Sequence, residues 1–126
     1  MSSEINFNEL RFFAEVKKRP GMFLGKPSLI SLRDYIFGMN HAFEIYGYDN
    51  QFYFFNLFKD WYFENVIEDK NGYACWWNHI LYVSGNDDAY AFHTFFNLFE
   101  NYLKDMHNLS LHEIELKPDV YIEEYL

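Results

Sequence analysis

The stretch NDDAYAFHTFFNLFENYLKDM, residues 86–106, decides the fold. Apolar residues recur in it at intervals of three and four, which places them on one face of a helix. Asn86, Asp87 or Asp88 is expected to cap this helix and to set negative charge at its positive end. The face expected to be buried consists of Ala89, Phe92, Phe96, Phe99, Leu103 and Met106. The stretch therefore predicts a long helix packed in a helical core.

Three earlier segments show the same period and predict helices over residues 7–17, 29–46 and 50–68. Pro20 ends the first helix, since the residue before a proline is pushed out of the α region. Gly47 is a natural stop for the second, because glycine readily adopts the left-handed conformation that follows a helix.

The second helix carries its own start signals. Ser28 or Ser31 is expected to cap it, and Ser31 with Asp34 resembles a capping box. Its buried face is predicted to run from the first turn to the last through Leu29, Leu32, Ile36, Met39, Phe43 and Tyr46. Gly38, in the middle, indicates a close crossing with another helix.

Two segments are harder to assign. Residues 73–83 fit a helix, which we favour, although residues 80–83 also fit a buried strand. Residues 109–126 alternate in part and contain Pro118, which predicts an extended acidic tail packed on the bundle. Together the segments predict an all-α fold, a compact bundle of about five helices forming a single domain over residues 1–126.

The composition narrows the classes of partner. Of the 126 residues, 23% are aromatic, more than a core of this size holds, so some rings are expected at the surface. Residues 1–33 hold six basic and three acidic residues, and residues 34–126 hold four basic and sixteen acidic ones. An acidic body disfavours nucleic acid and favours a basic protein partner. A lone cysteine, Cys75, with no signal peptide and no apolar run of membrane length, predicts a cytoplasmic protein that does not associate with membranes.

A search for catalytic chemistry finds two weak ligand pairs. His41 with Glu44 and Cys75 with His79 stand three and four residues apart, as metal ligands on one helix face do. Two ligands do not make a metal site, and polar surface or core packing explains both pairs. Nucleophile-elbow and phosphate-loop motifs are missing from the sequence. We therefore predict a non-enzyme with neither cofactor nor metal.

The block K-R-P-G-M-F-L-G, residues 18–25, resembles the K-R-P-G-M-Y-I-G stretch near the start of the ATPase domains of type II topoisomerases. Here Asn40 and Glu44 follow in the wrong order and spacing, and the D-x-G-x-G loop is missing, so the block does not predict an ATPase. We interpret it as structural. Pro20-Gly21 fits a type II turn with positive φ at Gly21. Arg19 is expected to bond helix-end carbonyls, and Met22, Phe23 and Leu24 are expected to plug the core.

A longer pattern joins this block to S-L-x-x-L-x-x-Phe/Tyr-I-x-G from Ser28 to Gly38, to a tryptophan-rich middle, and to an aromatic helix from Phe95 to Leu103, which together cover most of the chain. This order resembles small bacterial immunity proteins encoded beside secreted polymorphic toxins. The resemblance implies cytoplasmic protection by tight, stoichiometric binding to a toxin. It carries over no catalytic residues.

The leading hypothesis is thus an inhibitory binding protein whose basic partner is a toxin domain. Its partner-binding residues are predicted at two helix ends around a tryptophan pair: Trp61, Glu64, Glu68, Asp69, Trp76, Trp77, Asp87 and Asp88. The alternatives are a regulatory or housekeeping interaction domain and a small metal-dependent enzyme. The helix stripes fit a monomer or a homodimer equally.

Overall fold

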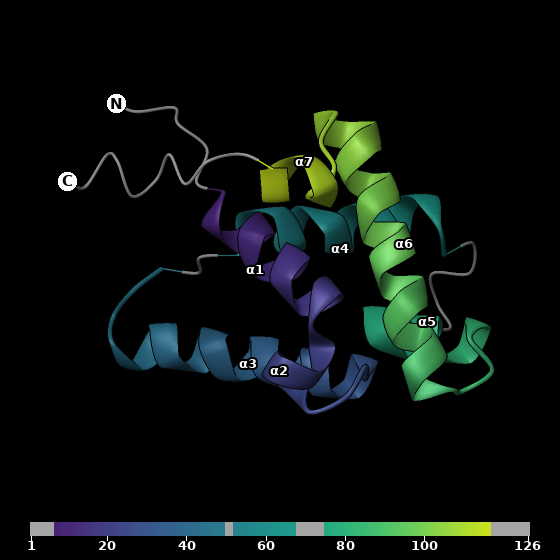
Figure 1. The fold of residues 1–126 in the computed structure, drawn as a ribbon, viewed down its shortest axis with the longest axis horizontal. Coiled ribbons are helices and arrows are strands. Elements are labelled where there is room, and N and C mark those ends of the chain that lie inside the picture. The colour runs from purple at the N-terminus through teal and green to yellow at the C-terminus, as the bar shows by residue number, and fades with distance from the viewer. Residues whose placement is uncertain (1–6, 50–51, 68–74, 117–126) are drawn as a thin grey trace.

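The computed structural model describes residues 7–49, 52–67 and 75–116, and all regular secondary structure in these ranges is helical (Figure 1). The predicted all-α class is confirmed, but the described ranges hold seven helices instead of about five. They are α1 (Asn8–Lys18), α2 (Pro20–Leu24), α3 (Leu29–Ile45), α4 (Tyr53–Asn65), α5 (Trp76–Val83), α6 (Asp88–His107) and α7 (Leu111–Leu116). None of the described helices is both long and apolar enough to span a membrane.

The short helix α2 replaces the type II turn predicted at Pro20-Gly21. The backbone breaks at Arg19, whose φ of −133° and ψ of 60° end α1, and Pro20 then opens α2 as its first residue. Proline is well suited to that position, because an N–H group in the first turn of a helix has no acceptor within the helix and its absence costs nothing. The left-handed residue is Gly25, with φ of 81°, instead of Gly21.

The core-plug prediction for the same block is wrong for Met22, which is 74% exposed, while Phe23 and Leu24 pack partly against the core. The Arg19 side chain lies 3.9 Å from the carboxylate of Glu15 in the last turn of α1. The Arg19 side chain therefore faces a carboxylate of α1, where the sequence predicted helix-end carbonyls.

The helix α7 corrects the prediction of an extended tail over residues 111–116. Ser110 Oγ accepts a hydrogen bond of 3.1 Å from Glu113 N, which caps the first turn. Leu111 and Ile114 then lie one turn apart and are buried where α7 packs on α1. Residues 117–126, the rest of the predicted tail, lie outside the described residues.

The core is an aromatic layer beneath α6. The predicted start, cap and stripe of α6 are confirmed at Asp87, Phe92, Phe96, Phe99 and Leu103, with the Asp87 carboxylate accepting from Tyr90 N at 3.0 Å. The stripe is wrong at its two ends, because Ala89 and Met106 are exposed. The buried rings of α6 meet those of α1 and α4, mostly edge-on or tilted. The most deeply buried rings of the core are Phe13, Phe54, Phe55, Phe58, Tyr62, Phe92, Phe95, Phe96, Phe99 and Tyr102.

The other sequence-predicted helices are confirmed, but α4 runs only from Tyr53 to Asn65 within the predicted range 50–68. Residues 76–83 form helix α5, which excludes the strand alternative there, and residues 73–74 lie outside the described residues. Gly47 ends α3 with φ of 75°, as predicted. Gly38 makes no close crossing, because a Cβ added there would have no heavy atom within 4 Å.

Two helices begin at carboxylates supplied by other helices. Phe52, the residue before α4, gives no side-chain cap, and instead Glu9 of α1 accepts hydrogen bonds from Phe54 N at 2.8 Å and Phe55 N at 2.7 Å. Because the two carboxyl oxygens of Glu9 satisfy free N–H groups at the start of the helix, this contact fixes α4 on α1.

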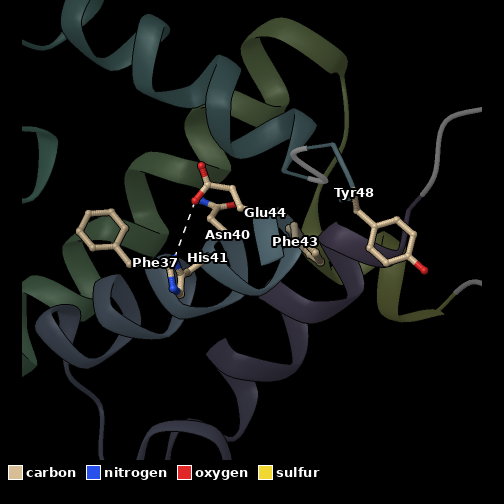
Figure 2. Close-up of a pocket in the computed structure, with 6 residues that line it drawn as sticks. All are labelled: Phe37, Asn40, His41, Phe43, Glu44 and Tyr48. Carbon is tan, nitrogen blue, oxygen red and sulfur yellow. Dashed lines mark ion pairs between the residues drawn. The ribbon is translucent and has the colours of Figure 1, made fainter. Parts of the chain in front are cut away.

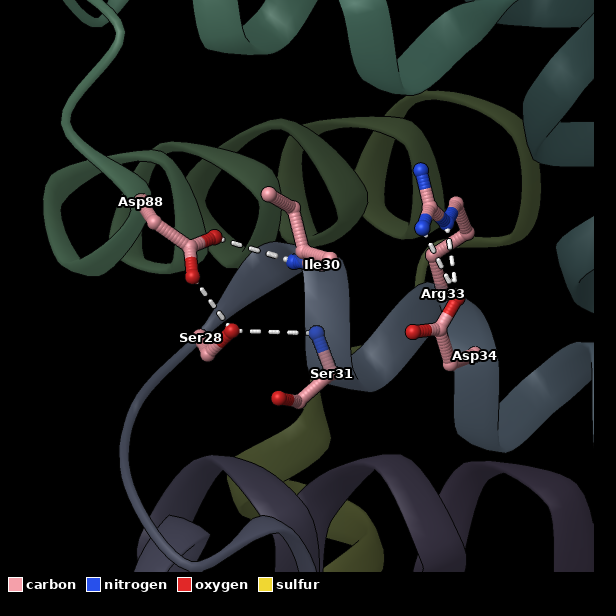
Figure 3. A network of polar contacts seen from close by, with 6 residues as sticks. All are labelled: Ser28, Ile30, Ser31, Arg33, Asp34 and Asp88. Carbon is pink, nitrogen blue, oxygen red and sulfur yellow. Dashed lines mark hydrogen bonds and ion pairs between the residues drawn. The ribbon is translucent and has the colours of Figure 1, made fainter.

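The start of α3 is held in the same way by Asp88 of α6 (Figure 3). Asp88 Oδ1 accepts from Ile30 N at 2.9 Å, and its other oxygen accepts from the hydroxyl of Ser28. Ser28 Oγ in turn accepts from Ser31 N at 3.0 Å, so Ser28 is the cap and the Ser31–Asp34 capping box is wrong. The first half of α3 is thereby fastened to α6.

Candidate functional site

The second half of α3 leaves the core. Leu29, Leu32 and Ile36 are buried, but none of the residues from Phe37 to Asp49 is. In Figure 1 α5 and α6 lie beside the beginning of α3, and the other end of α3 extends away from them. The segment 37–48 exposes four large apolar side chains, namely Phe37 (47%), Ile45 (64%), Tyr46 (76%) and Tyr48 (67%). The predicted burial of Tyr46 is therefore wrong.

This segment also forms a pocket of about 350 Å³. Figure 2 shows the side chains of Asn40 and Glu44 rising from the same side of α3, between the rings of Phe37 and Tyr48. This placement follows from the sequence, since residues four apart are neighbours on a helix surface. The lining consists of Phe37, Asn40, His41, Phe43, Glu44 and Tyr48.

One atom of the lining is unsatisfied. Asn40 Oδ1 is shielded from solvent and has no hydrogen-bond donor among the described residues. Buried polar atoms in folded proteins nearly always have a partner, so such an atom requires an explanation. The lining also holds the Glu44 carboxylate, which lies 3.8 Å from His41 Nδ1. The pocket thus combines ring surfaces with acceptors that lack a strong donor.

A row of packed side chains supports the pocket from the side of α5. The ring of Phe37 meets that of Trp77 edge-on at 5.3 Å, and the guanidinium of Arg33 lies over Trp77 at 5.4 Å. Trp77 is half-buried by these contacts. This predicted partner residue therefore lies next to the pocket and outside its lining.

The other described members of the predicted partner site have different surroundings. Trp76 is 3% exposed and packs against Phe55 and Phe95, so its ring offers a partner no surface. Trp61 is half-buried and donates from Nε1 to Asp105 at 2.9 Å, while Glu64 is exposed one turn further along α4.

The other acidic residues of the predicted partner site are either engaged in structural contacts or not described. Asp87 caps α6 and Asp88 holds the start of α3, so both carboxylates have structural partners. Glu68 and Asp69 lie outside the described residues. Of the eight predicted residues, only Trp61, Glu64 and Trp77 are described with accessible side chains free of a capping role.

The two candidate metal-ligand pairs, His41 with Glu44 and Cys75 with His79, lie in different environments. His41 and Glu44 are 73% and 82% exposed and form the pair at the pocket. His79 is hydrogen-bonded through Nδ1 to the hydroxyl of Tyr62, and burial raises the pKa of that tyrosine and lowers the pKa of His79. A neutral imidazole beside a buried phenol satisfies both polar groups in the core. Within the described ranges, groups of three or more metal-ligating side chains do not occur.

The sequence analysis did not single out the segment 37–48 as a site. Phe37 and Ile45 lie off the apolar stripe of α3, and residues 34–49 hold three acidic and no basic residues. Apolar residues outside a helix's buried stripe, within a stretch of single-sign charge, were the available signal. Comparison of the chain with family models, with curated proteins and with solved structures gave no match.

Proposed function

We propose that this protein is a non-catalytic binding protein that neutralises a bacterial toxin by tight binding, and that the segment 37–48 contacts the toxin. The observation that carries the proposal is the exposure of Phe37, Ile45, Tyr46 and Tyr48 at one end of a single helix. Exposed apolar groups gathered in this way are typical of surfaces that a partner covers.

The charge of the chain supports a basic partner. The net charge is −9, and the segment 37–48 lies in its acidic portion. An acidic field speeds the encounter with a basic protein, and tyrosine and phenylalanine side chains supply the buried contacts that hold it. The resemblance to immunity proteins, which rests on the R-P-G-M-F-L-G block and the pattern after it, supplies the toxin as the kind of partner.

The proposal predicts that a toxin is encoded beside this protein. The test is co-expression with the C-terminal domain of that toxin. Survival of the cells and co-purification of a stoichiometric complex are the expected results. Unchanged toxicity together with no complex overturns the proposal. Unchanged toxicity without a complex is the result expected if the protein is an interaction domain with no toxin partner.

Two variants then distinguish which of two candidate surfaces contacts the toxin. Tyr48→Ala is expected to weaken the complex by tenfold or more, as substitutions at central aromatic contacts do. Trp61→Ala probes the surface predicted from the sequence, which lies on α4. If Trp61→Ala weakens the complex and Tyr48→Ala does not, the binding surface is the α4 one and the assignment to segment 37–48 is wrong.

A further inference from the structure

The pocket on α3 has the chemistry of a receptor for one cationic side chain. Its walls are the rings of Phe37, Phe43 and Tyr48, and its polar atoms include the amide of Asn40 and the carboxylate of Glu44. We propose that this pocket binds the guanidinium of an arginine side chain presented by a protein partner. The proposal deepens the function proposed above by naming the chemical group that the surface recognises.

The unsatisfied oxygen of Asn40 indicates that the ligand carries a hydrogen-bond donor. Asn40 Oδ1 is shielded from solvent and finds no donor among the described residues. A guanidinium carries five N–H groups in a fixed planar fork, so one ligand can donate to the Glu44 carboxylate and, once it displaces the groups that cover Asn40 Oδ1, to that oxygen as well. These two side chains stand one helical turn apart on the same side of α3 (Figure 2).

The rings favour a flat cation over a neutral group. A guanidinium stacks on aromatic faces and is attracted by their electron density, more strongly where water is excluded. Figure 2 shows Phe37 and Tyr48 at opposite ends of the pocket, with Phe43 between them. At about 350 Å³ the pocket is at the small end of ligand sites, which suits one side chain better than a large cofactor.

The local charge agrees with this occupant. Residues 34–49 hold Asp34, Glu44 and Asp49 and no lysine or arginine. The neighbouring cation, Arg33, pairs with Asp34 at 2.8 Å and lies over Trp77. His41 lies 3.8 Å from Glu44, so a protonated imidazole competes with an incoming guanidinium for that carboxylate.

The first experiment uses short peptides and does not need the toxin. Acetyl-Gly-Arg-Gly-amide is titrated into the isotope-labelled full chain at pH 8, and the backbone amide signals are followed. The neutral isostere with citrulline in place of arginine is the matched probe. We expect saturable shifts centred on residues 37–48, and binding of the citrulline peptide weakened by about tenfold. No saturable shift, equal binding of the two peptides, or shifts centred elsewhere overturns the proposal.

Two variants test the named acceptors. Glu44→Gln and Asn40→Leu are each expected to weaken arginine-peptide binding by about tenfold, because each removes one acceptor. Glu64→Gln, which removes an exposed carboxylate from α4, is the matched control and is expected to change binding by less than about twofold. Equal losses in Glu44→Gln and Glu64→Gln overturn the pocket in favour of general charge attraction. Because Glu44 is 82% exposed, its variant is expected to keep the thermal midpoint of the wild type.

A second arm separates this inference from the proposed function. In the complex with the toxin domain, Glu44→Gln and Asn40→Leu are expected to raise the dissociation constant by about tenfold. A complex that both variants leave unchanged keeps the function and overturns the arginine pocket. Peptide binding at the pocket with no toxin complex keeps the pocket and overturns the toxin as partner.

Discussion

The helix α6 and the second half of α3 are both rich in aromatic and aliphatic residues, yet one is buried and the other is exposed. Along α6 the rings of Phe92, Phe95, Phe96 and Phe99 are at most 1% exposed. Along α3, residues 37–45 include none that are buried. The difference in burial arises from the helices that pack against each of the two regions. Helix α6 packs against α3, α4 and α5, whereas α5 and α6 cover only the beginning of α3.

This contrast shows that apolar residue type and helical period do not by themselves decide burial. The period places Leu29, Leu32 and Ile36 on a buried stripe, and it continues through Tyr46, which is 76% exposed. A surface that no other helix covers is available to a partner.

Phe99→Ala is expected to lower the free energy of unfolding by about 3–5 kcal/mol, since it leaves a cavity in a packed core. The ring of Phe99 lies 4.7 Å from that of Phe13 and 5.4 Å from that of Phe58. The matched change in the exposed region, Tyr46→Ala, is expected to cost less than about 0.5 kcal/mol. Urea unfolding of both variants measures the difference. Equal costs would mean that the end of α3 is packed like α6.

The next largest effect involves Glu9, whose carboxylate lies between α1 and α4. Burial raises the pKa of Glu9 from 4.5 to about 7, against the opposing effect of its backbone hydrogen bonds from Phe54 and Phe55. The folded chain therefore keeps a proton that the unfolded chain has already lost between these pH values. Since stability falls with pH wherever the folded state binds more protons, this group weakens the fold as pH rises from about 5 to 7.

Glu9→Gln removes this dependence. The free energy of unfolding of the wild type, relative to the variant, is expected to fall by about 2–3 kcal/mol between pH 5 and pH 8. The exposed control Glu44→Gln is expected to change stability by less than about 0.5 kcal/mol. Urea titrations at several pH values measure both. A relative stability that rises with pH would mean that the two N–H bonds of α4 outweigh burial and hold Glu9 ionised.

Glu9 and Asp88 also mark the limit of prediction from sequence. Capping rules examine the residue just before a helix, and they offered Asp87 as one of three candidates at α6 and Ser28 as one of two at α3. The caps at α4 and α3 from Glu9 and Asp88 come from residues 45 and 58 positions away in sequence. No local pattern encodes such a contact, because it forms only after the helices have packed.

The two missed helices had local signals that competed with stronger ones. Pro20 was interpreted as a helix stop, although proline is also favoured at a helix start, and here it is both. Ser110 stands three residues before Glu113, the spacing of a capping box, but the alternation of charge around it predicted an extended chain. The segment 37–48 had a weak local signal in Phe37 and Ile45, but Asn40 had none, since it is ordinary in sequence and unusual only through the unsatisfied Oδ1.

Asp88→Ala tests how the packed half of α3 is held. The change removes the acceptor for Ile30 N and leaves the hydroxyl of Ser28, which is 1% exposed, without its acceptor. We expect a loss of about 1–2 kcal/mol in the free energy of unfolding, together with faster hydrogen exchange at Ile30. Asp34→Ala, on the exposed side of α3, is the control, and an equal loss in it would contradict the assigned role of Asp88.

The smallest expected effect belongs to the ion pair between Lys17 of α1 and Glu100 of α6, whose side chains are 44% and 27% exposed. It joins the two helices across the rim of the core, where water still screens the charges. A double-mutant cycle with Lys17→Ala and Glu100→Ala is expected to give a coupling free energy of roughly 0.2–1 kcal/mol. The coupling should shrink as salt is raised, because the Debye length falls to about 3 Å at 1 M. A larger or salt-independent coupling would place this pair inside the packed region instead of at its edge.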